Sequence, residues 1–165
     1  MGDISFSIEH QGQDQWCWAA VTVSICEYYK DPSPSDQCDF VNQIFGPIRG
    51  DTDCCQEGGS DSCNMPWSLS NALSTVGHLA PPVRGVVSFD DLNEEIEVHQ
   101  RPVAVRITLS DLDATHFIVV VGCEQTADGG QWVKIADPSG AAGNIASIEY
   151  SALVDRLWDE SYFTT

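Results

Sequence analysis

Residues 17–29 constrain the fold more strongly than any other segment of the chain. Their sequence, CWAAVTVSICEYY, is typical of a helix, and apolar side chains fall on nearly every face of that helix. A surface helix shows one apolar stripe, whereas a helix that is apolar all round is buried. Residues 31–34 contain two prolines and stop the helix just after Lys30. We therefore predict a buried central helix.

Helical patterns fill the first half of the chain, and strand patterns fill most of the second half. We expect a second helix that Ser35 caps and Gly46 closes, and a third helix that Asn64 caps and Gly77 ends. Later elements are a strand at 83–87, a short helix opened by the capping-box pattern of 88–91, strands at 103–109, 115–123, 131–136 and 145–150, and a short helix at 152–158. Helices followed by an antiparallel sheet indicate an α+β fold.

Length and composition indicate a single globular domain. The chain has 165 residues, of which 42% are hydrophobic and 19% are charged. We predict one domain over residues 1–165, with a helical lobe at about 10–80, a sheet lobe at about 81–165, and a cleft between them. No apolar run approaches the roughly 18 residues that span a bilayer, and no signal peptide is visible at the N-terminus.

The charge balance limits the possible partners. Seven basic residues against twenty-five acidic ones give a net charge of −18. Nucleic-acid-binding proteins need a basic footprint, so this balance argues against a nucleic-acid partner. An acidic surface attracts cationic peptides, although solubility, export or salt adaptation explains the same charge. We expect a monomer without a membrane partner.

Four of the seven cysteines cluster in a stretch rich in Gly, Asp and Ser: Cys38, Cys54, Cys55 and Cys63. Such a stretch has little apolar content to order it, so we predict disulfides. A bond between the adjacent Cys54 and Cys55 is strained, so the expected sets join Cys38 to one of them and Cys63 to the other. Free thiols and a zinc site remain as alternatives, although no paired CxxC spacing is present. Disulfides predict a secreted or exported protein, with a cytoplasmic location as the alternative.

Cys17 lies where a loop runs into the predicted central helix. The N-terminus of a helix presents unsatisfied backbone N–H groups and the positive end of the dipole, and both favour a thiolate nucleophile. The alternative is a structural cysteine buried between Trp16 and Trp18. Cys26 falls half a turn out of phase with Cys17, and we expect it and Cys123 to be small buried hydrophobic residues.

A histidine and a carboxylate with suitable positions follow in the second half. His116 opens the apolar strand that contains residues 118–121, and Asp137 closes the next strand. We predict that His116 is the general base and acid and that Asp137 orients its ring. A turn-forming role for Asp137 is the alternative, and Asp111 and Asp113 are its local rivals. The remaining histidines are expected to be exposed or capping: His10, His78 and His99.

The stretches "Q…CWAA", "HF-x-V-V-x-G" and "DP" resemble the papain-like (clan CA) cysteine peptidases, in which an aromatic residue follows the nucleophile. They are most similar to the compact bacterial branch of C39-like peptidases and secreted effector proteases. The resemblance covers roughly residues 8–155 and preserves the order Gln, Cys, His, Asp. The chain lacks the full C-G-[SA]-C-[WY] string, carries Asp137 where papain has Asn, and has a shorter interval to the histidine than the about 130–150 residues of papain. These shorter intervals imply a minimal version of the papain-like fold.

The resemblance implies a peptidase that cleaves peptide bonds through an acyl-thioester on Cys17. His116 is then the general acid and base, Asp137 orients it, and Gln11 binds the oxyanion together with the Cys17 backbone N–H. Gln13 and Gln15 compete for the role of Gln11. No metal or organic cofactor is expected, and the substrate is a peptide or protein. A peptide cyclase or ligase that uses the same acyl-enzyme, and a non-catalytic peptide-binding module, are the alternatives.

Overall fold

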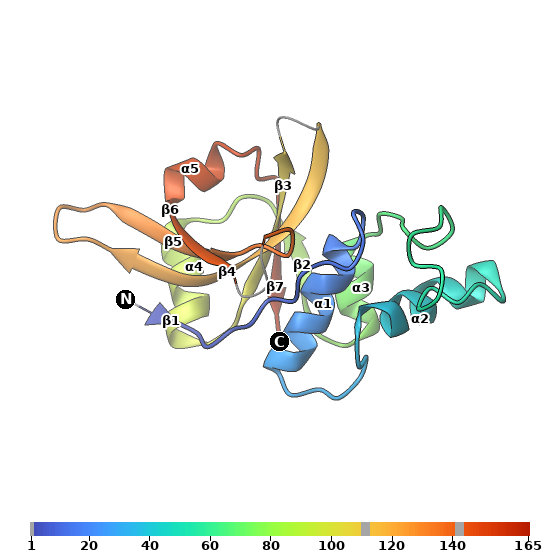
Figure 1. Ribbon diagram of the computed structural model, residues 1–165. Helices are drawn as coiled ribbons and strands as arrows, with labels where there is room; N and C mark the ends of the chain where they lie inside the picture. Colours follow the sequence, from blue (N-terminus) through green and yellow to red (C-terminus); the bar gives the residue numbers. More distant parts are fainter. Residues whose placement is uncertain (1, 110–112, 141–143) are drawn as a thin grey trace.

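The computed structural model describes residues 2–109, 113–140 and 144–165. It has an α+β fold in which helices α1, α2 and α3 lie on one side of an antiparallel sheet (Figure 1). Helix α1, Cys17–Tyr28, packs against strand β4 on one side and against α2 and α3 on the other. Every residue from position 17 to position 26 is buried, which confirms the predicted central helix.

The sheet has the strand order β2-β7-β3-β4-β5-β6, and β1 adds to β4. All pairings between the described strands are antiparallel. The strand bounds are β1 Gly2–Asp3, β2 Leu79–Arg84, β3 Val103–Leu109, β4 Ala114–Gln125, β5 Gln131–Ala136, β6 Ile145–Glu149 and β7 Glu160–Thr164. Strand β4 is central, and its residues 116–123 are all buried. It therefore forms the floor against which α1 packs.

The other helices are α2 Gln37–Arg49, α3 Leu69–Thr75, α4 Phe89–Asn93, the π-helical turn Glu94–Val98 and α5 Tyr150–Val154. The predicted capping box of α4 is confirmed, because Ser88 and Asp91 each accept a hydrogen bond from the backbone N–H of the other. No helix within the described part of the chain is long and apolar enough to cross a membrane.

The predicted ends of α2 are wrong. Asp36, not Ser35, caps the helix, because its carboxylate accepts from the Asp39 N–H at 2.8 Å. The helix also continues through Gly46 and ends at Gly50, which has a φ of 72°. A glycine can stay helical, and the one that takes the left-handed conformation is the one that ends the helix.

The predicted start of α3 is also wrong. Ser68 caps this helix by accepting from the Asn71 N–H at 3.3 Å. Asn64 instead accepts a hydrogen bond from the Gln15 N–H at 2.9 Å, which places it beside the loop before α1. A side chain that can cap a helix has bonded to a distant backbone amide, and local sequence does not reveal that choice.

Two predicted elements of the second half have wrong bounds, and one strand is missing from the prediction. Strand β2 covers residues 79–84 rather than 83–87, and α5 covers 150–154 rather than 152–158. Strand β7 was not predicted, although it pairs with both β2 and β3. Its residues 161–164 are buried on both faces. Such a strand lacks the alternating pattern that marks a half-buried strand in sequence.

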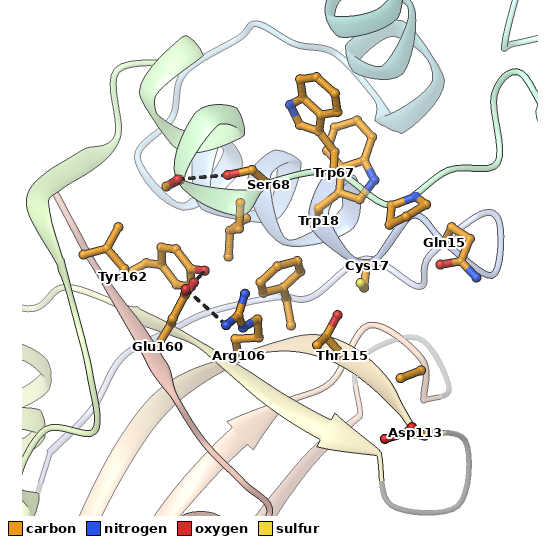
Figure 2. A pocket seen from close by; sticks show the side chains of 16 residues that line it. Gln15, Cys17, Trp18, Trp67, Ser68, Arg106, Asp113, Thr115, Glu160 and Tyr162 are labelled. Carbon is orange, nitrogen blue, oxygen red and sulfur yellow. Dashed lines mark hydrogen bonds and ion pairs between the residues drawn. The ribbon is translucent and has the colours of Figure 1, made fainter.

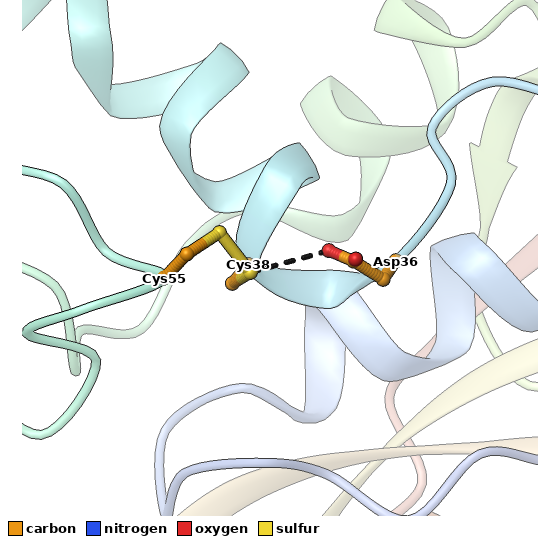
Figure 3. A group of neighbouring side chains, drawn as sticks. All are labelled: Asp36, Cys38 and Cys55. Atoms are coloured by element: carbon orange, nitrogen blue, oxygen red, sulfur yellow. Dashed lines mark hydrogen bonds between the residues drawn. A yellow bond between two sulfur atoms is a disulfide. The ribbon is translucent and has the colours of Figure 1, made fainter.

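Two disulfides join the clustered cysteines, Cys38 to Cys55 and Cys54 to Cys63, which is one of the two expected sets. Figure 3 shows the Cys38–Cys55 bond beside Asp36, whose carboxylate lies 3.3 Å from the Cys38 sulfur. Asp36, Cys38 and Cys55 are close enough together to suggest a metal site. However, both sulfurs are bonded to each other, so the group offers none of the thiolates that zinc prefers.

Candidate active site

Cys17 is the first residue of α1 and is only 8% exposed. The side chains on either side of it are anchored to the same distant segment. The indole N–H of Trp16 donates to the carbonyl of Cys63 at 2.8 Å, and that of Trp18 donates to the carbonyl of Met65 at 2.9 Å. The helix start, and with it the thiol, is therefore fixed by contacts with residues that lie more than forty positions further along the chain.

His116 lies in the buried central strand β4, opposite Ile107 of β3. Its Nε2 atom lies 2.7 Å from Oδ1 of Asp137, the residue that follows β5. Strands β4 and β5 are neighbours in the sheet, so the two side chains are brought together by strand pairing. Sequence reasoning missed Ser139, whose N–H and hydroxyl donate to the same Asp137 oxygen at 2.8 and 2.7 Å. The signal was present, since an Asp two residues before a Ser favours such a turn.

His116 interacts with both Cys17 and Asp137. Burial lowers the pKa of His116, but hydrogen bonds with Asp137 and with Cys17 outweigh it and raise the pKa to about 9. Burial raises the pKa of Asp137, but the hydrogen bonds from His116 and Ser139 lower it to about 2. At neutral pH the imidazole is therefore charged and Asp137 is ionised. Because Nε2 faces Asp137, Nδ1 is the ring nitrogen left for Cys17.

Gln11 lies close to this group, but its side-chain amide faces its own loop. Its Nε2 donates to the carbonyls of Gln13 at 3.1 Å and Asp14 at 2.9 Å. Its Oε1 is buried and has no hydrogen-bond partner among the described residues. The backbone N–H of Gln11 donates to the carbonyl of Pro138 at 2.8 Å, next to Asp137. The structure thus ties the Gln11 loop to the turn of Asp137 while both amide hydrogens are engaged elsewhere.

Cys17 opens into a groove of about 860 Å³ between the helices and the sheet. Figure 2 shows Trp18, Trp67 and Ser68 on the helical side and Thr115, Arg106 and Tyr162 on the sheet side. Gln15 lines the groove near Cys17, whereas Gln11 is not among the lining residues.

One end of the groove carries a charged cluster. Arg106 pairs with Asp159 at 2.8 Å and with Glu160 at 3.2 Å, and the Tyr162 hydroxyl donates to Glu160. The hydrogen bond with Asp159 is the main reason that the pKa of Arg106 lies above its usual value. Two carboxylates around one guanidinium leave this end of the groove with a net negative charge.

The other aspartates and histidines that the sequence offered for these roles lie outside the Cys17–His116–Asp137 group. Asp113 is exposed at the edge of the groove, and Asp111 lies outside the described residues. The other histidines have their own surroundings: His10 is exposed next to the Gln11 carbonyl, His78 stacks on Tyr29, and His99 is exposed beside Glu94. Burial is the main cause that raises the pKa of Cys26 and of Cys123 to about 12, so both remain thiols.

Comparison with known proteins identifies the family of the chain. A family model described as "papain-like cysteine protease AvrRpt2" matches residues 2–152. A search of curated proteins finds no match. Among solved structures, the chain is similar to the bromelain protease of Ananas comosus in complex with the E64 inhibitor, at 12% sequence identity and a TM-score of 0.48, with 96% of this chain and 93% of that chain covered. Because the family match spans most of its length, the chain belongs to the AvrRpt2 family of papain-like cysteine proteases.

Proposed function

We propose that this cysteine protease hydrolyses peptide bonds through an acyl-thioester on Cys17. The observation that carries the proposal is that His116 interacts with Cys17 and that its Nε2 lies 2.7 Å from Oδ1 of Asp137. This is the arrangement that an activated thiol nucleophile requires: a base in contact with the nucleophile and a third group that orients the base.

In the proposed reaction Cys17 acts as a thiolate beside the imidazolium of His116. The Cys17 thiolate attacks the carbonyl carbon, and a C–S bond forms as the carbonyl electrons move to oxygen. When the tetrahedral intermediate collapses, the C–N bond breaks and His116 gives its Nδ1 proton to the leaving amine. Water then attacks the thioester while His116 takes its proton, and the C–S bond breaks to release the acid and regenerate Cys17.

Asp137 acts by orientation in this proposal. Its carboxylate accepts from Nε2 of His116, which directs Nδ1 toward Cys17. The two hydrogen bonds from Ser139 hold the carboxylate itself. They also hold down the pKa of Asp137, so the orienting group stays ionised across the working pH range.

We propose that the oxyanion is bound by the Cys17 backbone N–H and by Gln11. The amides in the first turn of a helix have no acceptor within the helix, so the Cys17 N–H is available. The Gln11 amide can donate to the oxyanion only after one of its two hydrogen bonds to loop carbonyls breaks. Its Oε1 is buried without a hydrogen-bond partner among the described residues, which lowers the free-energy cost of that rearrangement. Gln15 is the competing donor because it lines the groove.

The substrate of this proposal is an extended peptide that lies in the groove of a single domain.

Labelling with iodoacetamide tests the nucleophile: Cys17 should react at mildly acidic pH, and His116→Ala should slow that reaction. Cys17→Ala should abolish cleavage, while Cys26→Ala, which removes a buried thiol of the same helix, should retain it. Product masses distinguish hydrolysis from ligation. Cleavage that persists in Cys17→Ala would remove the proposal.

A further inference from the structure

We infer that the segment of residues 53–65, here called the cysteine loop, is a positioning element for the nucleophile. The Cys54–Cys63 disulfide acts through Trp16 and Trp18. The protease therefore needs a reduced Cys17 and an oxidised Cys54–Cys63 pair at the same time. This inference rests on the proposed role of Cys17.

Three consecutive residues at the end of the cysteine loop accept hydrogen bonds from the residues around Cys17. The Gln15 N–H donates to the Asn64 side chain at 2.9 Å. The Trp16 indole donates to the Cys63 carbonyl at 2.8 Å. The third bond, from the Trp18 indole, reaches residue 65 at 2.9 Å. Bonds on both sides of Cys17 thus end on one short stretch of the loop.

The middle of the cysteine loop also packs closely on this region. A Cβ atom added to Gly58 would lie 3.1 Å from the Trp16 ring and 3.0 Å from the Gln13 amide nitrogen. Only a glycine allows so close an approach without displacing a neighbour. The loop backbone therefore lies directly against the ring of the residue that precedes the nucleophile.

The disulfides are the main means by which the cysteine loop keeps this position. Residues 53–64 of the loop contain turns and bends, and their only hydrophobic side chains are those of the three cysteines, while Met65 at the end of the loop packs against the core. Cys54 and Cys63 are 3% and 0% exposed, so their bond forms the buried anchor of the loop. Cys55 is exposed and ties the loop to α2 through Cys38, and it lies eight positions before Cys63, the first of the three acceptors.

Paired serine variants separate the two disulfides. We expect Cys54→Ser/Cys63→Ser to lower kcat by about three- to tenfold, the scale of one or two hydrogen bonds, with a smaller change in KM. Alkylation of Cys17 at mildly acidic pH should slow by a similar factor, because the thiol is no longer held against His116. Cys38→Ser/Cys55→Ser should stay within about twofold of the native protein. Circular dichroism checks that each variant is folded under the assay conditions.

The indole bond gives a second test that leaves both disulfides intact. Trp16→Phe keeps an aromatic ring but removes the N–H that bonds to Cys63, and it should reproduce part of the loss in kcat. Trp132→Phe, in β5 outside the groove, is the matched control and should leave kcat unchanged. When Trp16→Phe is combined with Cys54→Ser/Cys63→Ser, the losses should be smaller than additive, because both changes remove the same contact.

The inference fails if folded Cys54→Ser/Cys63→Ser shows native kcat and a native pH dependence of Cys17 alkylation. It also fails if both disulfide variants lose activity equally, since the effect would then be general destabilisation. The proposed function is judged separately by Cys17→Ala, which contains both disulfides. If Cys17→Ala is inactive while Cys54→Ser/Cys63→Ser keeps native kcat, only the positioning role of the cysteine loop is overturned.

Discussion

The backbone N–H of Gln11 donates to the carbonyl of Pro138 at 2.8 Å, although the two residues lie 127 positions apart in the chain (138 − 11). Gln11 belongs to the loop that leads to Cys17, and Pro138 follows the carboxylate that holds His116. One hydrogen bond therefore sets the distance between the loop on the helical side and the turn on the sheet side. The two halves of the candidate site are therefore joined by a backbone hydrogen bond as well as by side-chain contacts.

Replacing Asp137 by Asn should lower activity less than replacing it by Ala. Asp137→Asn keeps an oxygen that accepts from His116, so it should lower kcat/KM less than Cys17→Ala does. Asp137→Ala removes the acceptor and should lower it further, because the imidazole loses its orientation. Asp113→Ala, at the edge of the groove, is the control. Steady-state kinetics with a peptide substrate decide the matter, and a large loss in Asp113→Ala alone would show that the wrong acid was chosen.

Activity should fall as the pH rises through about 9, the pKa that Asp137 and Cys17 confer on His116 against the effect of burial. Above that value the imidazolium that protonates the leaving amine is lost. Asp137→Asn removes the negative charge, so its alkaline limb should move to lower pH. The pH dependence of kcat/KM for both proteins measures this shift. Coincident alkaline limbs would exclude His116 as the titrating group.

The same pKa determines how stability depends on pH. The folded protein holds the His116 proton more tightly than the unfolded chain, whose histidine pKa is about 6.5. The stability contributed by this group is therefore complete below 6.5 and declines as the pH rises through about 9. Urea unfolding at several pH values should show this decline in the native protein. In His116→Ala the decline over this window should be smaller.

Gln11→Ala should lower kcat by on the order of 100-fold, with a smaller effect on KM, because an oxyanion donor acts in the transition state. The substitution keeps the backbone bond to Pro138, so the frame of the site is retained. Gln15→Ala removes the competing amide, which lines the groove, and should change KM more than kcat. The opposite pattern in the two variants would assign the oxyanion role to Gln15.

Gln37→Ala should destabilise the fold and lower activity. The buried Gln37 side chain accepts from the Gly12 N–H at 2.9 Å and donates to the His10 carbonyl at 2.9 Å, on both sides of Gln11. Its loss removes two hydrogen bonds to the backbone, each of which contributes about 0.5–1.5 kcal/mol. Urea unfolding measures the change in free energy, and Gln125→Ala, at an exposed position, is the control. Equal stability of the two variants would show that the hydrogen bonds of Gln37 do not stabilise this loop.

The two disulfides should be reduced in sequence. The Cys38–Cys55 bond has an exposed partner, whereas both sulfurs of the Cys54–Cys63 bond belong to buried residues. An attacking thiolate reaches an exposed disulfide more easily, so Cys38 and Cys55 should be alkylated first in a reductant titration. Before reduction, mass spectrometry of the native protein should find none of these four cysteines alkylated. Alkylation of all seven would contradict both bonds.

The amino-acid sequence by itself determined the features that local patterns encode. A segment that is apolar on nearly every face became the buried helix α1, a histidine began the buried stretch of β4, and an aspartate followed directly after the next strand. The crowding of Cys54 and Cys55 limited the disulfides to two sets, since neighbouring cysteines pair poorly. These inferences needed only periodicity, capping preferences and covalent geometry.

Only the tertiary structure decided which distant groups meet. The bond between Gln37 and the Gln11 loop, the anchoring of Trp16 on Cys63, and the direction of the Gln11 amide depend on contacts between remote segments. Strand β7 gains its place from pairing with β2 and β3, because its own residues carry no alternating pattern. A polar side chain can form a hydrogen bond with several backbone groups, some of them close in sequence and some remote. Packing between remote segments decides which of these bonds forms.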